Sequence, residues 1–163
     1  MFGKVLIVNR GAIARRIIRA CDALGIPSAV AYSEADADAP YLAEAGEALP
    51  LAGNRAADTY LNAAALLDCL DRCGADAVHP GYGFLAENAD FAEAVIARGA
   101  TFIGPSPQWL RSMGDKIEAR RLMAGHGFPV LPGSGALADA EAARREAERL
   151  GFPLMLKPAA GGG

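Results

Sequence analysis

The chain has 163 residues, of which 52% are hydrophobic, and its 16 Lys or Arg residues against 19 Asp or Glu residues give a formal net charge of −3. This length fits one ordinary domain, or a small domain and part of a second, and the apolar content is enough for a real core. The near balance of charge disfavours nucleic acid or an anionic membrane surface as a partner.

The other compositional signals predict a soluble, cytoplasmic protein. Cys21, Cys69 and Cys73 form no C-x-x-C pair. Cys69 and Cys73 lie one helical turn apart, a spacing more typical of small buried apolar residues than of metal ligands. The apolar run before Asn9 is too short for a signal peptide, and no segment reaches the ~18 apolar residues that a membrane span requires. We therefore expect a reducing compartment and no membrane partner.

The first part of the chain alternates between strand-like and helix-like segments. Residues 5–8 are an apolar run without alternation, as in a parallel strand covered on both faces. Apolar residues then recur at helical spacing from Ile13 to Leu24, and residues 28–32 are again strand-like. Further strands are predicted at 48–51, 75–79 and 101–103, and further helices at 62–73 and 89–98. This order predicts an α/β fold with a doubly wound, mostly parallel sheet.

The alternation ends at Gly104-Pro105-Ser106-Pro107, which is the best candidate domain boundary in the chain. Beyond it we predict helices at 106–113, 116–126 and 139–150, and a turn-rich connection at 128–135. The last helix carries Glu141/Arg145 and Arg144/Glu148 pairs, which indicate an exposed face. Residues 153–157 are predicted to form a buried strand that ends in a single charge, that of Lys157.

Two lysines are candidate phosphate ligands. Lys157 is followed at once by a small-residue segment that ends in Gly161, Gly162 and Gly163. Backbone amides approach phosphate oxygens closely where no Cβ intervenes, and a lysine supplies a point charge for the same oxygens. Lys116 lies in the first turn of a predicted helix, where the helix dipole gives a cation no advantage. The alternatives are a flexible terminal linker and an ordinary solvated lysine.

A glycine-punctuated segment, residues 79–88, follows a predicted strand with the sequence HPGYGFLAEN. Ligands of doubly wound sheets bind at the carboxyl ends of strands, and this segment carries a phenol, a carboxylate and an amide there. The alternative is a tight turn with Tyr82 and Phe84 packed as core aromatics. For His79 we expect a structural hydrogen bond and assign no catalytic role.

The turn after the first predicted strand allows a comparison with dinucleotide-binding folds. It has only one glycine, Gly11, where the G-x-G-x-x-G fingerprint needs three. Glu34 and Asp36, after the second predicted strand, could imitate the acid that binds a ribose. The match is partial, and an NAD-type site stays a minor alternative.

Taken together, the segments NRGAIARRIIRACDALGI, HPGYGFLAEN, FIGPSPQWLRSMGDK and LMLKPAAGGG resemble those of biotin carboxylases, in the same order and spacing. The resemblance spans essentially the whole chain. It implies a Rossmann-like pre-ATP-grasp domain over residues 1–113, followed by the beginning of an ATP-grasp domain over residues 114–163 that is truncated in the glycine-rich loop. The implied enzyme is a ligase of fatty acid or acyl-CoA metabolism.

The resemblance also implies a reaction. In that family ATP and bicarbonate give carboxyphosphate and ADP with the help of Mg²⁺, and a biotin tethered to a carrier is then carboxylated. Lys116, Lys157 and the glycines Gly161–Gly163 resemble the ATP-binding residues. Tyr82, Gly83 and Glu87 resemble the wall that faces biotin and bicarbonate. The implied partners are a biotin carboxyl carrier protein or domain, a carboxyltransferase component and a second copy in a homodimer.

Some positions depart from the family pattern. Ala12 and Ala86 stand where glutamate and serine are usual, and Ala23 replaces a frequent glutamate on the helix that contributes to the family's dimer surface. The metal ligands and catalytic residues of the family lie in later sequence, so this chain is expected to contain none of them. We therefore expect a fragment that is inactive alone. The alternatives are a stand-alone Rossmann-like nucleotide-binding or interaction module without catalysis, and a piece that pairs with a separately encoded remainder.

Overall fold

The computed structural model describes residues 1–157 of the chain. The chain divides into two compact units, Met1–Leu110 and Arg111–Gly163. Among the described residues, no helix is long and apolar enough to cross a bilayer.

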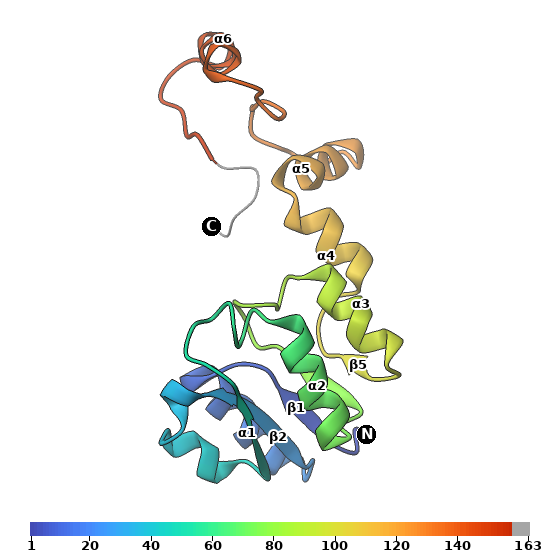
Figure 1. Ribbon diagram of the computed structural model, residues 1–163. Helices are drawn as coiled ribbons and strands as arrows, with labels where there is room; N and C mark the ends of the chain where they lie inside the picture. The colour runs from blue at the N-terminus through green and yellow to red at the C-terminus, as the bar shows by residue number, and fades with distance from the viewer. Residues whose placement is uncertain (158–163) are drawn as a thin grey trace. The chain divides into compact units, whose positions relative to one another are not determined.

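A five-stranded parallel sheet forms the centre of the first unit (Figure 1). The strand order is β3-β2-β1-β4-β5, so β1 lies in the middle and the chain reverses direction across the sheet after β3. This order is the one found in Rossmann-like folds, and it confirms the predicted doubly wound sheet. The strands are β1 (Val5–Ile7), β2 (Ser28–Ser33), β3 (Glu47–Leu51), β4 (Ala77–His79) and β5 (Thr101–Phe102).

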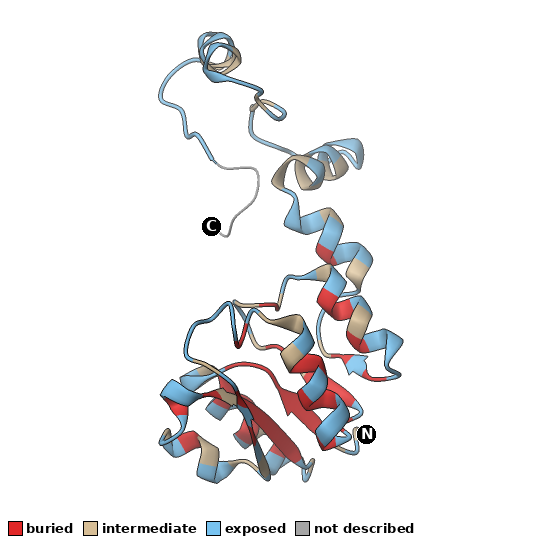
Figure 2. Cartoon of the chain, in the orientation of Figure 1, coloured by how far each residue is buried: buried red, intermediate tan, exposed pale blue. Residues whose placement is uncertain are grey.

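Helices cover both faces of this sheet, because successive strand side chains point to opposite sides. On one face, α1 (Gly11–Ala23) packs against Val5 and Ile7 of β1. On the other face, α2 (Ala63–Cys73) and α3 (Ala89–Ala97) pack with Leu6 and other residues of a larger cluster. Figure 2 shows the buried residues concentrated on the strands and on the helices beside them.

Short polar side chains begin the two helices of the larger cluster. Asn62 Oδ1 accepts a hydrogen bond from the Ala65 amide at 3.2 Å, and Asn88 Oδ1 accepts one from the Phe91 amide at 2.8 Å. Each such cap stabilises a helix by about 1 kcal/mol, because it satisfies an amide that has no partner inside the helix. Gly74 ends α2 with a φ of 61°, a left-handed conformation that glycine adopts without strain.

The predicted strands and helices of the first unit all form, with bounds within two residues of those expected. Two short 3₁₀ helices, η1 (Glu34–Asp36) and η2 (Pro40–Glu44), are additional. Cys21, Cys69 and Cys73 are free and buried, as expected of small apolar residues. The edge strand β3 contains Pro50, which pairs in register with Tyr32 of β2.

The remaining helices are α4 (Pro107–Gly114), α5 (Lys116–Gly125) and α6 (Ala140–Leu150). Asp115 begins α5 by accepting hydrogen bonds from the amides of Ile117 and Glu118 at 2.8 and 3.0 Å. The predicted ion pair between Glu141 and Arg145 forms at 3.1 Å. The predicted pair between Arg144 and Glu148 does not form, and Arg149 pairs with Glu146. None of residues 111–157 is buried.

One prediction for this region is wrong. Residues 153–157 were expected to form a buried strand, but they are exposed and hydrogen-bonded to no neighbouring strand. A strand is held by main-chain hydrogen bonds to an adjacent strand, and residues 111–157 contain no other strand that could provide them. The apolar run alone therefore misled the prediction.

Candidate functional site

Three residues of the turn after β4 have a positive φ. Gly81 and Gly83 have φ values of 66° and 75°, and Phe84 between the turn and α3 has a φ of 43°. A Cβ on Gly81 would come within 2.5 Å of Ile13 Cγ2 and 2.8 Å of Asn9 Nδ2. Only glycine fits there, because both the backbone conformation and the available space exclude a side chain.

Asn9 connects this turn to the end of β1. Its side chain is fully buried, and Nδ2 donates hydrogen bonds to the carbonyl oxygens of Pro80 at 2.7 Å and Tyr82 at 2.8 Å. Its Oδ1 accepts a hydrogen bond from the Arg10 amide at 2.8 Å. The sequence analysis did not identify Asn9 as a site residue. The available signal was its position as the first polar residue after a buried strand.

His79 ends β4 and stabilises the same turn. Its Nδ1 accepts a hydrogen bond from the Gly81 amide at 3.0 Å, which requires that nitrogen to be unprotonated. Burial lowers the pKa of His79, so the neutral ring is favoured. The structural role expected for this histidine is the one that the structure shows.

The turn presents the predicted biotin-side residues at its surface. Tyr82 is 73% exposed, and Gly83 and Glu87 are exposed as well. Phe84 instead stacks on Tyr60, with ring centroids 4.9 Å apart and an interplanar angle of 22°. The alternative of two core aromatics is therefore correct for Phe84 and wrong for Tyr82. The exposed phenol is available to a ligand.

A second polar cluster lies after β2, where Asp36 is buried. Its carboxylate accepts hydrogen bonds from Arg10 Nε at 2.6 Å, from the Tyr60 hydroxyl at 2.9 Å and from the Ser33 hydroxyl at 3.2 Å. The hydrogen bond from Arg10 lowers the pKa of Asp36, and burial raises the pKa of Tyr60. Tyr41 lies nearby with a buried hydroxyl that has no hydrogen-bond partner among the described residues.

This cluster does not support the NAD-type alternative. Asp36 is already bound by Arg10, so its carboxylate is occupied by the protein's own groups. Glu34 accepts hydrogen bonds from the Gly53 amide and from Asn54 Nδ2, both at 3.1 Å. Both acids thus bind groups of the protein itself, as expected of structural residues.

The predicted ATP-binding residues all belong to the second part of the chain. Lys116 is the first residue of α5 and is half-buried, directly after the capping residue Asp115. Lys157 lies in the exposed segment that follows α6. Gly161, Gly162 and Gly163 lie outside the described residues. The ATP-binding role of these residues therefore remains a prediction.

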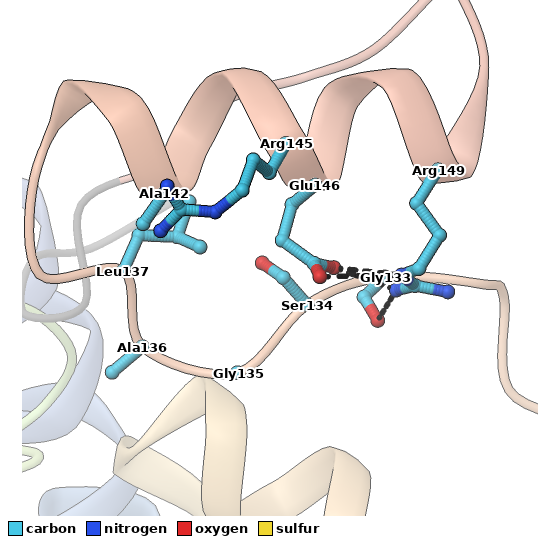
Figure 3. Close-up of a pocket in the computed structure, with 9 residues that line it drawn as sticks. All are labelled: Gly133, Ser134, Gly135, Ala136, Leu137, Ala142, Arg145, Glu146 and Arg149. Atoms are coloured by element: carbon cyan, nitrogen blue, oxygen red, sulfur yellow. Dashed lines mark hydrogen bonds and ion pairs between the residues drawn. The ribbon is translucent and has the colours of Figure 1, made fainter.

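A pocket of about 440 Å³ lies between the 133–137 loop and α6 (Figure 3). Arg149 pairs with Glu146 at 2.7 Å and donates a hydrogen bond to the Gly133 carbonyl at 3.4 Å. Arg145, which also lines the pocket, pairs with Glu141 at 3.1 Å. Both arginines of the pocket thus have carboxylate partners in the same helix, and neither Lys116 nor Lys157 lines the pocket. The pocket is not the predicted nucleotide site.

Comparisons with known proteins find related sequences along the whole chain. Residues 1–110 match the family model described as biotin carboxylase, N-terminal domain, and residues 115–163 match that of the carbamoyl-phosphate synthase L chain, ATP binding domain. Biotin carboxylase 2 of Bacillus subtilis is 51% identical over 164 residues, which cover 100% of this chain and 37% of the relative. The 2-oxoglutarate carboxylase small subunit of Hydrogenobacter thermophilus is 48% identical and is covered to 34% of its length.

Solved structures resemble the chain equally well. The biotin carboxylase of Campylobacter jejuni, titled as a β,γ-ATP complex, has a TM-score of 0.94 at 44% identity, covering 100% of this chain and 37% of that one. The biotin carboxylase domain dimer of the H. thermophilus 2-oxoglutarate carboxylase, in complex with MgADP, ADP and bicarbonate, has a TM-score of 0.95 at 48% identity, with 100% and 36% covered. The chain spans roughly a third of the length of these relatives.

Proposed function

The chain belongs to the biotin carboxylase family, and on this basis we propose that it forms the amino-terminal part of an ATP-dependent ligase that carboxylates carrier-bound biotin with bicarbonate through carboxyphosphate. The observation that carries the proposal is that residues 1–110 and 115–163 match two consecutive family models and that the whole chain is 51% identical to a biotin carboxylase. The 163-residue chain alone is proposed to be inactive.

We propose residues 1–113 as the pre-ATP-grasp domain and residues 114–163 as the beginning of the ATP-grasp domain. The adjoining family matches support this division, since one ends at residue 110 and the other begins at residue 115. In the second domain, Lys116, Lys157 and Gly161–Gly163 would hold ATP. Phosphoryl transfer to bicarbonate depends mainly on positioning and on neutralising phosphate charge, and ammonium groups and backbone amides supply both.

Magnesium is the metal that the proposed reaction requires. It would neutralise phosphate charge during the transfer of the γ-phosphoryl group. Among residues 1–157, no group of three or more His, Cys, Asp or Glu side chains could hold a metal ion. We propose no magnesium ligand among the described residues, and we propose that carboxylates from the later part of the family pattern hold Mg²⁺ together with the ATP phosphates.

We propose that the exposed turn after β4 faces biotin and bicarbonate. Tyr82, Gly83 and Glu87 all lie at the surface of that turn, at the carboxyl end of a parallel strand. Ligands of open α/β sheets bind at this end, and here a phenol, a backbone amide and a carboxylate are grouped there. These residues would orient the ligand, since the proposed chemistry takes place on groups of the second domain.

The proposed partners are a biotin carboxyl carrier protein or domain, a carboxyltransferase component and a second copy of the protein. The H. thermophilus domain is titled as a dimer, which supports the last of these. The helix α1 corresponds to the one that contributes to the family's dimer surface, and its Arg19 forms an ion pair with Glu44 of the same chain at 2.8 Å. The three buried free cysteines fit a reducing compartment, and we propose the cytoplasm.

The decisive experiment is an assay of the complete gene product for ATP hydrolysis that depends on both bicarbonate and biotin. The proposal expects such activity, and it expects Lys116→Ala and Lys157→Ala to raise the KM for ATP at least tenfold. Each variant removes one ammonium contact to phosphate, and the loss of one charge-assisted contact is sufficient for an effect of that size. Absence of bicarbonate- and biotin-dependent hydrolysis in the folded gene product would contradict the proposal.

Calorimetry of the 163-residue chain distinguishes the stand-alone module. The proposed function expects little or no nucleotide affinity from this part of a site. Clear nucleotide binding that is unaffected by Lys116→Ala or Lys157→Ala would favour the module without catalysis instead.

A further inference from the structure

The Asn9 side chain bonds two segments that are distant in the sequence, the end of β1 and the turn after β4. Both Nδ2 hydrogens are donated to carbonyl oxygens, of Pro80 and Tyr82, and Oδ1 accepts from the Arg10 amide. The residue is fully buried, so no water competes for these bonds. A buried amide whose two donors and oxygen are all hydrogen-bonded holds its partners rigidly, because each lost bond would leave a buried polar group unpaired.

The geometry of the two acceptors determines the conformation of the turn. Pro80 and Tyr82 are two residues apart, and a single NH₂ group can bond both carbonyls only if the chain folds around it. Gly81 lies between them and has no side chain. Asn9 Nδ2 and Ile13 occupy the space that a Cβ at this position would need. The Asn9 side chain therefore fits against the turn only when residue 81 is glycine.

Farther along the turn, a stacking contact holds the chain from the other end. Phe84 stacks on Tyr60, whose hydroxyl donates to Asp36 at 2.9 Å. This contact fixes a side chain, whereas Asn9 fixes the main chain on both sides of Gly81. The segment with the exposed Tyr82 side chain and Gly83 lies between these two anchors.

We propose that Asn9 is a positioning residue that sets the Tyr82–Gly83 main chain in the conformation that receives biotin. The inference rests on the proposed function of the turn as the biotin side of the site. Asn9 itself touches no substrate, since its side chain is buried behind the turn. Its effect on the reaction is transmitted through the Tyr82 carbonyl.

The kinetic test compares Asn9→Ala with Asn62→Ala in the complete gene product. Asn62 also uses its side chain to bond a backbone amide, but it does so at the start of α2. Asn9→Ala is expected to raise the KM for biotin at least tenfold and to leave the KM for ATP within about twofold, because only the turn moves. Asn62→Ala is expected to change neither KM. An equal rise in both KM values, or no change in the KM for biotin, would overturn the inference.

A second measurement does not depend on activity. Hydrogen exchange of the 163-residue chain is expected to show faster exchange of the residue 81–84 amides in Asn9→Ala, with α2 unchanged. If the alanine variant does not fold, Asn9→Ser, which keeps one donor, is expected to show the same local change to a smaller degree. Unchanged exchange at residues 81–84 in a folded variant would refute the positioning role. Faster exchange in a gene product without biotin-dependent activity would instead refute the proposed function and its dependent kinetic claim.

Discussion

The two parts of the chain differ in what they bury. In residues 1–110, every strand of the sheet has neighbours or helices that cover its apolar side chains, and Leu6, Ile7 and Val78 are essentially inaccessible. In residues 111–157 no residue is buried, and Leu131 and Leu156 are 84% and 80% exposed. Both parts contain capped helices with apolar residues. Capped, amphipathic sequences thus form helices in both parts, but only the first part has a sheet on which helices pack to make a core.

The largest expected effect comes from a core substitution in the first unit. Leu6→Ala at the centre of β1 is expected to lower the free energy of unfolding by about 2–5 kcal/mol, because it removes a buried side chain and leaves a cavity. Leu131→Ala, at an exposed position, is expected to change it by less than about 0.5 kcal/mol. Urea titration of the 163-residue chain measures both. Equal losses would show that the second part has a core of its own.

Breaking an ion pair is expected to have an effect of intermediate size on the free energy of unfolding, and each part of the chain offers one pair to test. Asp36→Asn is expected to cost about 2 kcal/mol, since Arg10 loses its buried partner. Arg145→Gln, which breaks the exposed pair with Glu141, is expected to cost less than about 0.5 kcal/mol. A loss for Arg145→Gln as large as that for Asp36→Asn would contradict the contrast between the two parts.

Asp36 is also expected to make the free energy of unfolding depend on pH. The folded-state pKa of Asp36 lies below its ordinary value of 3.8, so its contribution is complete above pH 3.8 and is lost as the pH falls through the folded pKa. Unfolding free energies measured over this acidic range should therefore fall more steeply in the wild type than in Asp36→Asn. Parallel curves would mean that Arg10 does not stabilise the carboxylate.

The smallest expected effect concerns His79 in the first unit. Burial places the folded-state pKa of His79 below 6.5, so the unfolded chain takes up the proton first. Stability is expected to be complete above pH 6.5 and to decline as the pH falls from there toward the folded pKa. His79→Asn, which keeps an acceptor for the Gly81 amide, should flatten this slope. A pH dependence in His79→Asn that is as steep as in the wild type would contradict this role of the histidine.

Most strands and helices of the first unit could be predicted, because each is encoded by the pattern of adjacent residues in its own segment. A buried parallel strand is an uninterrupted apolar run, and residues 5–8 and 28–32 show that run where β1 and β2 form. The same reasoning failed for residues 153–157, because whether such a run forms a strand depends on a neighbour that the run itself does not encode. Local pattern predicts which segments can form strands, and pairing decides which of them do.

The candidate site was predictable to a similar degree. The exposure of Tyr82 and Gly83 could be expected from a glycine-punctuated turn after a strand. Asn9 could not be identified, because its hydrogen-bond partners lie 71 and 73 residues away in the sequence. The Arg10–Asp36 pair spans 26 residues and depends on how far the chain turns after β2. Contacts of this kind follow from the sheet order, which the sequence pattern leaves open.

Pro50 has a consequence for self-association. It lies in β3, the outer strand next to β2, and a proline on an edge strand removes a main-chain donor that an incoming strand would use. Amyloid-like growth along this side of the sheet is therefore disfavoured by a single residue. Replacing it with valine would restore the donor and make intermolecular strand addition easier.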